Sequence, residues 1–139
     1  MSYEPIAITA STTLGDTHEG TEVVMNAAAG LTVTLPAASA TGKVFTLVVG
    51  TTVTSNDYVI QVANATDVMQ GALGVSTDAA GVVIPTAATS DTITMNGSTT
   101  GGVKGSTVVL RDIASGVWAV SGALVSTGTE ATPFSAAVS

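Results

Sequence analysis

The sequence contains no cysteine, very few basic residues and few aromatic ones. Without cysteine there can be no disulfide framework and no thiolate metal site. Lys43, Lys104 and Arg111 are the only basic residues, and the formal net charge is −7. Binding to nucleic-acid phosphates or to anionic membranes depends on clustered cations. We therefore expect the chain to bind neither nucleic acid nor membrane.

Charged residues of both signs are scarce. They make up 9% of the 139 residues, well below the usual quarter. A monomer with so little surface charge is poorly protected against association, so we expect a homo-oligomer or a chain that works inside a larger assembly.

The sequence has no signal peptide pattern at its start and no run of 18 apolar residues. These absences predict a soluble protein made in the cytoplasm.

Short runs rich in Val and Thr, separated by Gly, Pro, Asn and Asp, make up most of the chain. Eight to ten such runs predict an all-β fold, and we expect a single-domain antiparallel sandwich of the jelly-roll type. Three regions are predicted. Residues 1–22 form an extended N-terminal arm and an acidic loop, residues 23–125 form the β-sandwich domain, and residues 126–139 form an extended C-terminal tail.

The clearest predicted element is a β-hairpin whose two apolar runs lie at residues 108–110 and 117–120. It carries Trp118, the only tryptophan of the chain. A tryptophan brings roughly 150 to 250 Å² of surface to bury. We therefore expect a core or oligomer anchor made by Trp118 and its apolar neighbours, which are Val108, Leu110 and Val120.

A second hairpin is predicted from the strict apolar and polar alternation of residues 31–35, followed by a turn segment and the run at 44–49. Further strands are predicted at residues 58–62 and 92–95. The latter runs into Asn96-Gly97, a strong hairpin-turn dipeptide, and we expect a flexible hairpin loop there. Residues 71–91 show the weakest pattern, and within them only 82–84 suggest a strand.

The residues offer little catalytic chemistry. His18 is the only histidine and lies beside Asp16 and Glu19. Such a cluster can hold zinc or supply a base, but there is no second histidine and no G-x-S-x-G nucleophile motif, so we favour a solvated loop. Five aspartates are scattered along the chain, at Asp57, Asp67, Asp78, Asp91 and Asp112. They lack the spacing of a calcium-binding loop, and we interpret them as turn residues. We predict no catalytic residue, no metal and no cofactor, and therefore no enzyme.

Five segments taken together carry a resemblance to a known family. They lie at residues 30–38, 42–46, 58–62, 91–97 and 112–118. Together they resemble a recurring module of tailed-bacteriophage structural proteins, common in marine and cyanobacterial phages, which includes head decoration or cement proteins of about this size. The resemblance covers about residues 30–124 and consists of turn and strand patterns without catalytic content.

The resemblance implies a structural protein of the virion, located on the capsid exterior and made in the host cytoplasm. Its partner would be the major capsid protein, and it would stabilise the shell by bridging capsomers, as a homotrimer. Similar modules also occur within longer tail-fibre chains. The alternative is therefore a tail-fibre or adhesin module that binds a host-surface glycan, although such modules usually expose several aromatic residues.

The N-terminal arm lies outside the resemblance, and we expect it to be the capsid-binding element. Tyr3 combines an apolar ring with a polar tip, Ile6 and Ile8 are β-prone, and Pro5 restricts the segment to a sheet edge. Such an arm can add a strand to a sheet of the capsid protein.

Two consequences follow from this assignment of the arm. Deletion of residues 2–13 is expected to leave the β-domain folded and to abolish capsid binding. In the competing interpretation the arm packs on its own trimer, and Pro133 and Phe134 of the tail contact the shell.

Overall fold

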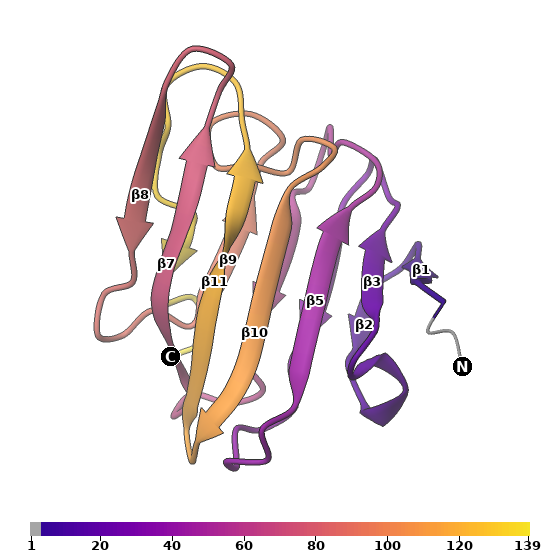
Figure 1. Cartoon of the computed structure of the whole chain (residues 1–139), viewed down its shortest axis with the longest axis vertical. Helices are drawn as coiled ribbons and strands as arrows, with labels where there is room; N and C mark the ends of the chain where they lie inside the picture. Colours follow the sequence, from indigo (N-terminus) through magenta and orange to yellow (C-terminus); the bar gives the residue numbers. More distant parts are fainter. Residues whose placement is uncertain (1–3) are drawn as a thin grey trace.

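Two β-sheets stack on each other in the computed structural model of the chain (Figure 1). Apolar side chains that alternate along the strands are buried between them. The structure describes residues 4–139. Across these residues one sheet has seven strands, in the order β1 (Ile6–Ile8), β3 (Glu22–Met25), β5 (Val44–Val49), β10 (Thr107–Ala114), β11 (Val117–Val125), β7 (Val68–Ser76) and β8 (Gly81–Pro85). The other has five, in the order β12 (Phe134–Ser135), β9 (Thr92–Met95), β6 (Tyr58–Gln61), β4 (Leu31–Thr34) and β2 (Thr12–Thr13). The predicted all-β sandwich is confirmed.

Both sheets mix parallel and antiparallel pairs. The pairs β10–β11, β10–β5, β7–β8, β6–β9 and β9–β12 are antiparallel. The pairs β1–β3, β3–β5, β7–β11, β2–β4 and β4–β6 are parallel. A parallel pair needs a connection that crosses over, and here the chain makes this crossing by passing to the opposite sheet between strands. The prediction of a purely antiparallel arrangement was therefore too simple.

The hairpin around Trp118 forms as predicted. Strands β10 and β11 pair antiparallel, with Leu110 opposite Val120 and Asp112 opposite Trp118. A register shift between Asp112 and Ala114 marks a bulge next to the turn. This hairpin lies at the centre of the seven-stranded sheet, between β5 and β7 (Figure 1).

The second predicted hairpin is wrong. Residues 31–34 and 44–49 are both strands, but β4 belongs to the five-stranded sheet and β5 to the seven-stranded one. Strand β4 pairs in parallel with β2 and β6, because the nine residues after it cross from one sheet to the other instead of turning back. Local alternation identifies a strand, but it does not identify the partner of that strand.

The Asn96-Gly97 turn also connects the two sheets rather than two paired strands. The Asn96 side chain accepts hydrogen bonds from the Ser98 and Thr100 N–H groups at 2.8 and 3.2 Å. Gly97 has φ +79°, and a Cβ there would lie 2.0 Å from the Val53 carbonyl oxygen. The loop predicted to be a flexible hairpin loop is thus a crossover that packs closely against the segment before β6.

The predicted boundaries at residues 22 and 126 do not separate an arm and a tail from the sandwich. Strands β1 and β2 are edge strands of the two sheets, and β12 is the other edge of the five-stranded sheet. Ile8 and Phe134 are buried in the core. Both terminal segments contain extended stretches as expected, but their strands pair with the domain, β1 with β3, β2 with β4 and β12 with β9.

Two features of the strands escaped the sequence prediction. Strand β7 spans nine residues, although Gly71 and Gly74 interrupt its apolar alternation. A short 3₁₀ helix, η1 (Asp16–His18), occupies the acidic loop. No helix among the described residues has the length and apolar character required to cross a membrane.

Candidate functional site

The predicted anchor residues all lie in the core between the sheets. Trp118 is fully buried and its ring centroid is 5.8 Å from that of Phe45, with the rings tilted by 49°. Val108, Leu110 and Val120 are buried beside it. The side chain of Trp118 therefore stabilises the fold of the chain itself and offers no surface to a partner.

The predicted capsid-binding residues lie in different environments. Tyr3 falls outside the described residues. Pro5 is exposed, whereas Ile6 is half-buried and Ile8 is buried against the core. The two isoleucines pack inside their own domain, because β1 pairs with β3 and turns them toward the second sheet. Ile8 cannot fill a pocket on another protein in this conformation, whereas Ile6 keeps part of its side chain exposed.

The acidic loop contains an ion pair and a histidine with a local role. The Lys43 ammonium lies 2.5 Å from Asp16 Oδ1, and this hydrogen bond lowers the pKa of Asp16 and raises that of Lys43. His18 Nδ1 accepts a hydrogen bond from the Gly15 N–H at 3.0 Å. Within residues 4–139 no group of three or more His, Cys, Asp or Glu side chains is placed to hold a metal ion. The loop is a capped turn on the surface.

The most developed polar cluster surrounds Asp112, at the end of β10. Its buried carboxylate accepts hydrogen bonds from the backbone N–H groups of Ser39, Ala40 and Thr41, at 2.9 to 3.2 Å. The Thr41 hydroxyl donates a further bond at 2.7 Å. Ala40 adopts φ +60°, a left-handed conformation that is unfavourable for alanine. The carboxylate holds the crossover between β4 and β5 in this curled conformation, which we call the Asp112 nest (residues 39–41 and 112).

The backbone of Asp112 completes this attachment. Its carbonyl oxygen accepts from the Gly42 N–H at 2.9 Å, and its own N–H donates to the Lys43 carbonyl at 3.0 Å. Asp67 reinforces the same crossover, because its buried carboxylate accepts from the Ala38 N–H at 2.8 Å. The middle of the segment that links the two sheets is thus fixed by two carboxylates from elsewhere in the chain, Asp67 at Ala38 and Asp112 at residues 39–41.

The ionisation of Asp112 reflects two opposing effects. Burial raises the pKa of its carboxyl group, whereas the hydrogen bonds from Thr41, Ser39 and Ala40 lower it, and the net pKa is lower than usual. Asp91 behaves in the same way. Burial raises its pKa, but bonds from the Thr92 hydroxyl and from Val138 and Ser139 bring it below the ordinary value. Both aspartates are charged structural groups.

Sequence reasoning assigned Asp112 and Asp91 to turns and missed these long-range bonds. A signal existed for Asp112. Val108, Leu110 and Asp112 follow one another with the period of two that places them on one face of a strand, and that face is the buried one. No comparable signal marked Asp91, because its partners lie at the far end of the sequence.

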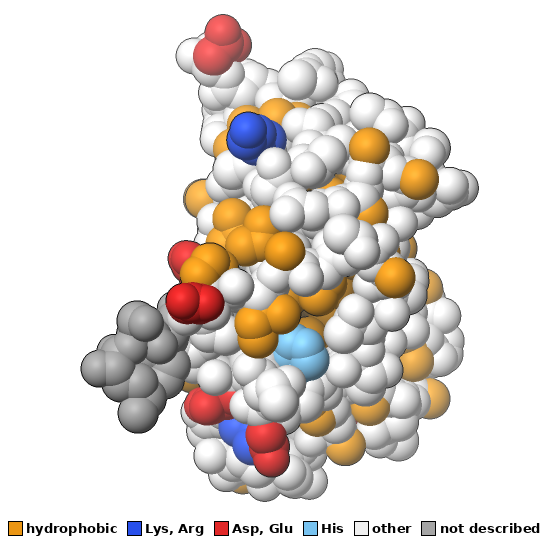
Figure 2. Space-filling model, turned by 90° about the vertical axis from the view of Figure 1, so that its right-hand side faces the viewer, with side chains coloured by type: hydrophobic (Ala, Val, Ile, Leu, Met, Phe, Trp, Pro, Cys, Tyr) orange, Lys and Arg blue, Asp and Glu red, His pale blue; other side chains and the backbone are white. Residues whose placement is uncertain are grey.

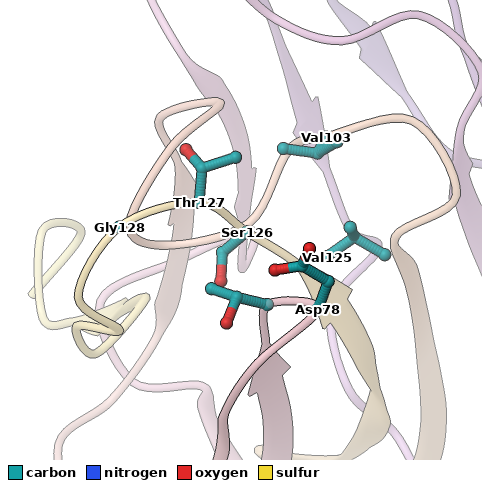
Figure 3. Close-up of a pocket in the computed structure, with 7 residues that line it drawn as sticks. Asp78, Val103, Val125, Ser126, Thr127 and Gly128 are labelled. Atoms are coloured by element: carbon teal, nitrogen blue, oxygen red, sulfur yellow. The ribbon is translucent and has the colours of Figure 1, made fainter.

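A cleft of about 430 Å³ opens beside the turn between β7 and β8 (Figure 3). Its lining includes Asp78 from that turn, Val103 from the loop before β10, and Val125, Ser126 and Thr127 at the end of β11. The Ser126 hydroxyl already donates to the Ser76 carbonyl at 3.1 Å. The cleft therefore offers one carboxylate, a few hydroxyl groups and two apolar patches to a polar ligand, and no aromatic ring.

The surface carries few charges and little aromatic area. Viewed at the β1 edge, most of the surface is uncharged, and acidic and basic side chains are scattered over it (Figure 2). Among the described residues, Phe45, Tyr58, Trp118 and Phe134 are all buried. Aromatic stacking, which commonly contributes to sugar recognition, has no exposed platform on this part of the chain.

Comparison with known proteins gives no match: no family model fits the chain, and no curated protein or solved structure is similar to it. The structure itself defines a two-sheet all-β sandwich whose loops are hydrogen-bonded to buried aspartates of the same chain.

Proposed function

We propose that this chain is a non-enzymatic structural protein of a tailed bacteriophage. It binds the outer surface of the capsid through the major capsid protein and stabilises the shell by bridging capsomers. The observation that carries the proposal is the way the five segments of the family resemblance fit together. Residues 30–38, 58–62 and 91–97 include the adjacent strands β4, β6 and β9. Residues 42–46 and 112–118 are joined by the backbone bonds of Asp112.

The two groups are joined by the Gly116 N–H, which donates to the Ala38 carbonyl at 3.0 Å. The five segments thus form one connected unit. The sparsely charged surface gives independent support, because a protein that is covered in an assembly does not need charges to remain apart from its neighbours. The proposed assembly is a homotrimer, and the number three comes from the resemblance. Repeating a modest contact around a closed oligomer makes the overall attachment tight through effective concentration.

The outer edge of β1 is the proposed attachment element. The Ile8 carbonyl accepts from the Asn26 N–H at 2.9 Å, so the peptide groups of Ile6 and Ile8 face β3. Backbone direction alternates along a strand, and the N–H and C=O groups of Ala7 therefore point away from the sheet. A strand of the capsid protein can pair there by augmentation, with the exposed Pro5 flanking the contact.

The test removes the outward N–H of β1 and leaves the hydrogen bonds between β1 and β3 in place. In Ala7→Pro the N–H is lost on the side that faces away from β3, where proline is tolerated. Capsids assembled from the major capsid protein of the same phage are mixed with wild-type or variant protein and sedimented, and bound protein is measured. We expect wild-type to cosediment at saturating stoichiometry and Ala7→Pro to lose at least tenfold in affinity, as expected for about 1.5 kcal/mol.

The matched control is Ala7→Ser, which changes the same exposed position but keeps its outward N–H and should bind capsids as wild-type does. Absence of wild-type binding would overturn the proposed function. Equal binding by Ala7→Pro would exclude β1 as the attachment element. If the protein binds instead to glycans of the host surface, and Asp78→Ala in the cleft abolishes that binding, the adhesin alternative replaces this proposal.

A further inference from the structure

The four edges of the two sheets differ in how well they are protected. Strands β2 and β12 have only two residues each. Strand β1 has three, and it follows the exposed residues Glu4 and Pro5. Short strands, charged side chains and proline are common ways of preventing an edge from pairing with another chain. Strands β2 and β12 are protected by their shortness, and β1, whose outer edge is assigned above to the capsid contact, offers only three residues.

Strand β8 is different. It has five residues, Gly-Val-Val-Ile-Pro, with no charged side chain. It forms the edge of the seven-stranded sheet opposite β1 (Figure 1). Val82 is 44% exposed and Val83 is 69% exposed, although their side chains point to opposite faces. The strand thus presents apolar side chains on both faces together with an open backbone edge.

The register of β8 against β7 shows which backbone groups are free. Leu73 lies opposite Ile84 and Val75 opposite Val82. Hydrogen bonds run from the Thr86 N–H to the Gly71 carbonyl at 2.9 Å and from the Thr77 N–H to the Ala80 carbonyl at 2.7 Å.

Since hydrogen-bonded pairs alternate along an antiparallel ladder, these two bonds place the peptide groups of Ile84 and Val82 toward β7. Those of Gly81, Val83 and Pro85 point outward. Pro85 occupies an outward position, where its missing N–H costs the sheet nothing.

We propose that β8 pairs with β8 of a second copy of this chain, antiparallel about a two-fold axis at Val83. In this register the Val83 residues of the two copies exchange a reciprocal pair of hydrogen bonds. The Gly81 N–H of each copy donates to the Pro85 carbonyl of the other. Val82 lies opposite Ile84 on one face, and the two Val83 side chains meet on the other, so each apolar residue of the strand gains an apolar neighbour.

The self-complementary register and the lack of charge along β8 favour a second copy as the occupant. The chain carries a net charge of −7, so most contacts between two copies bring acidic groups together, and like charges placed directly opposite destabilise a strand pair. The nearest charged residues along the chain from β8 are Asp78 and Asp91, both outside the paired strand. Strand β8 can therefore face itself without placing a charge opposite a like charge, and its five residues form a longer ladder than the three of β1.

This contact is independent of the capsid contact at β1 and goes beyond the proposed function. Because it is two-fold, it joins copies of the chain in pairs, whatever other contacts each copy makes. On a shell, it would link neighbouring copies of the protein laterally, in addition to their attachment to the capsid.

The test measures the mass of the full chain by light scattering over a concentration series. In Val83→Lys two lysines face each other across the axis, and we expect the mass to halve relative to wild-type. Val83→Glu should behave in the same way. An equimolar mixture of the two variants should recover the wild-type mass, because lysine then faces glutamate. Pro85→Val supplies the missing donors, and we expect it to tighten association by about tenfold.

Ile113→Lys is the matched control, since Ile113 is a 53% exposed apolar residue on the interior strand β10, and it should leave the mass unchanged. Urea unfolding of each variant verifies that it is folded. A wild-type protein that is monomeric throughout the series would overturn the proposal. So would an unchanged mass in Val83→Lys, or a mixture that fails to recover. None of these outcomes bears on capsid binding, which is measured separately with Ala7→Pro.

Discussion

Buried carboxylates tie distant loops of this sandwich to its strands. Asp67, Asp91 and Asp112 are each less than 5% exposed and accept bonds from residues 29 to 73 positions away in the sequence. With few large side chains available for the core, the chain uses charged acceptors to order its loops. A carboxylate is suited to this role because its two oxygens can accept several N–H groups at once.

The Asp112 nest predicts a stability that depends on pH. Because the pKa of Asp112 is lower in the folded chain than its ordinary value, the charged carboxylate stabilises the fold above the unfolded pKa of about 3.9. That contribution is lost as the pH falls through the lower, folded pKa. At pH 7, Asp112→Asn should reduce the free energy of unfolding by about 2 to 3 kcal/mol, measured by urea denaturation.

The difference between Asp112→Asn and wild-type should shrink once the pH is below the folded pKa, since both chains then carry an uncharged group. Asp78→Asn serves as the control, because Asp78 is exposed and its replacement should change stability by less than about 0.5 kcal/mol. A difference that stays constant from neutral to strongly acidic pH would show that the charge of Asp112 does not stabilise the nest.

At the scale of elements, the sequence predicts strands better than it predicts their partners. The β10–β11 hairpin is correct because a short polar turn joins its two strands, and this local closure leaves few alternatives. Strands β4 and β5 are separated by a longer segment whose path depends on Asp67 and Asp112, and these lie far along the chain. The parallel pairs are also non-local. A short stretch of sequence does not contain both strands of such a pair together with the residues that bring them side by side.

Gly71 and Gly74 interrupt the apolar alternation of β7, so the sequence pattern did not predict this strand. Gly71 is also the residue that allows β7 to pack closely against β11. Gly71 has φ +146°, and a Cβ at this position would lie 2.0 Å from the Val120 carbonyl oxygen of the neighbouring strand β11. We therefore expect Gly71→Ala to force β7 away from β11 and to destabilise the protein by about 3 kcal/mol or more, from the unfavourable φ together with the backbone clash. The midpoint and slope of urea unfolding provide the measurement.

Gly74→Ala in the same strand is the matched control. A Cβ there would meet only the Gly122 carbonyl oxygen, at 3.8 Å, which is an ordinary contact. Its effect on stability should stay within about 1 kcal/mol, since replacing a strand glycine by alanine also reduces the entropy of the unfolded chain. Equal effects of the two substitutions would contradict the close approach of β7 and β11 at Gly71.

At the scale of the whole molecule, the sequence predicted the position of Trp118 correctly but not the strand that pairs with the N-terminal segment. Trp118 could be assigned to the core because its size and its place in a β-run allow few alternatives. The N-terminal segment could be recognised as an edge strand from Pro5, Ile6 and Ile8. Its partner could not, because the sheet that receives it is formed by β3 and β5, whose parallel pairing leaves no local signal.

This pairing changes the expected result of truncating the N-terminus. Removal of residues 2–13 takes β1 from one sheet, β2 from the other and Ile8 from the core. Burial of one isoleucine contributes about 1.5 to 3 kcal/mol, and the exposed edges of β3 and β4 add to the loss. Because the net stability of a domain is about 5 to 15 kcal/mol, we expect the truncated chain to be markedly destabilised, with a lower urea midpoint and a tendency to aggregate.

Ala7→Pro distinguishes this structural role of the segment from a role in attachment. It keeps Ile8 and the bonds between β1 and β3, so its urea midpoint should lie close to that of wild-type, whereas the truncated chain should unfold far earlier. A truncated chain with wild-type stability would mean that β1 and β2 contribute little to the sandwich. In that case residues 2–13 would be free to act as the separate arm that the sequence predicted, and deletion would again become a clean test of capsid binding.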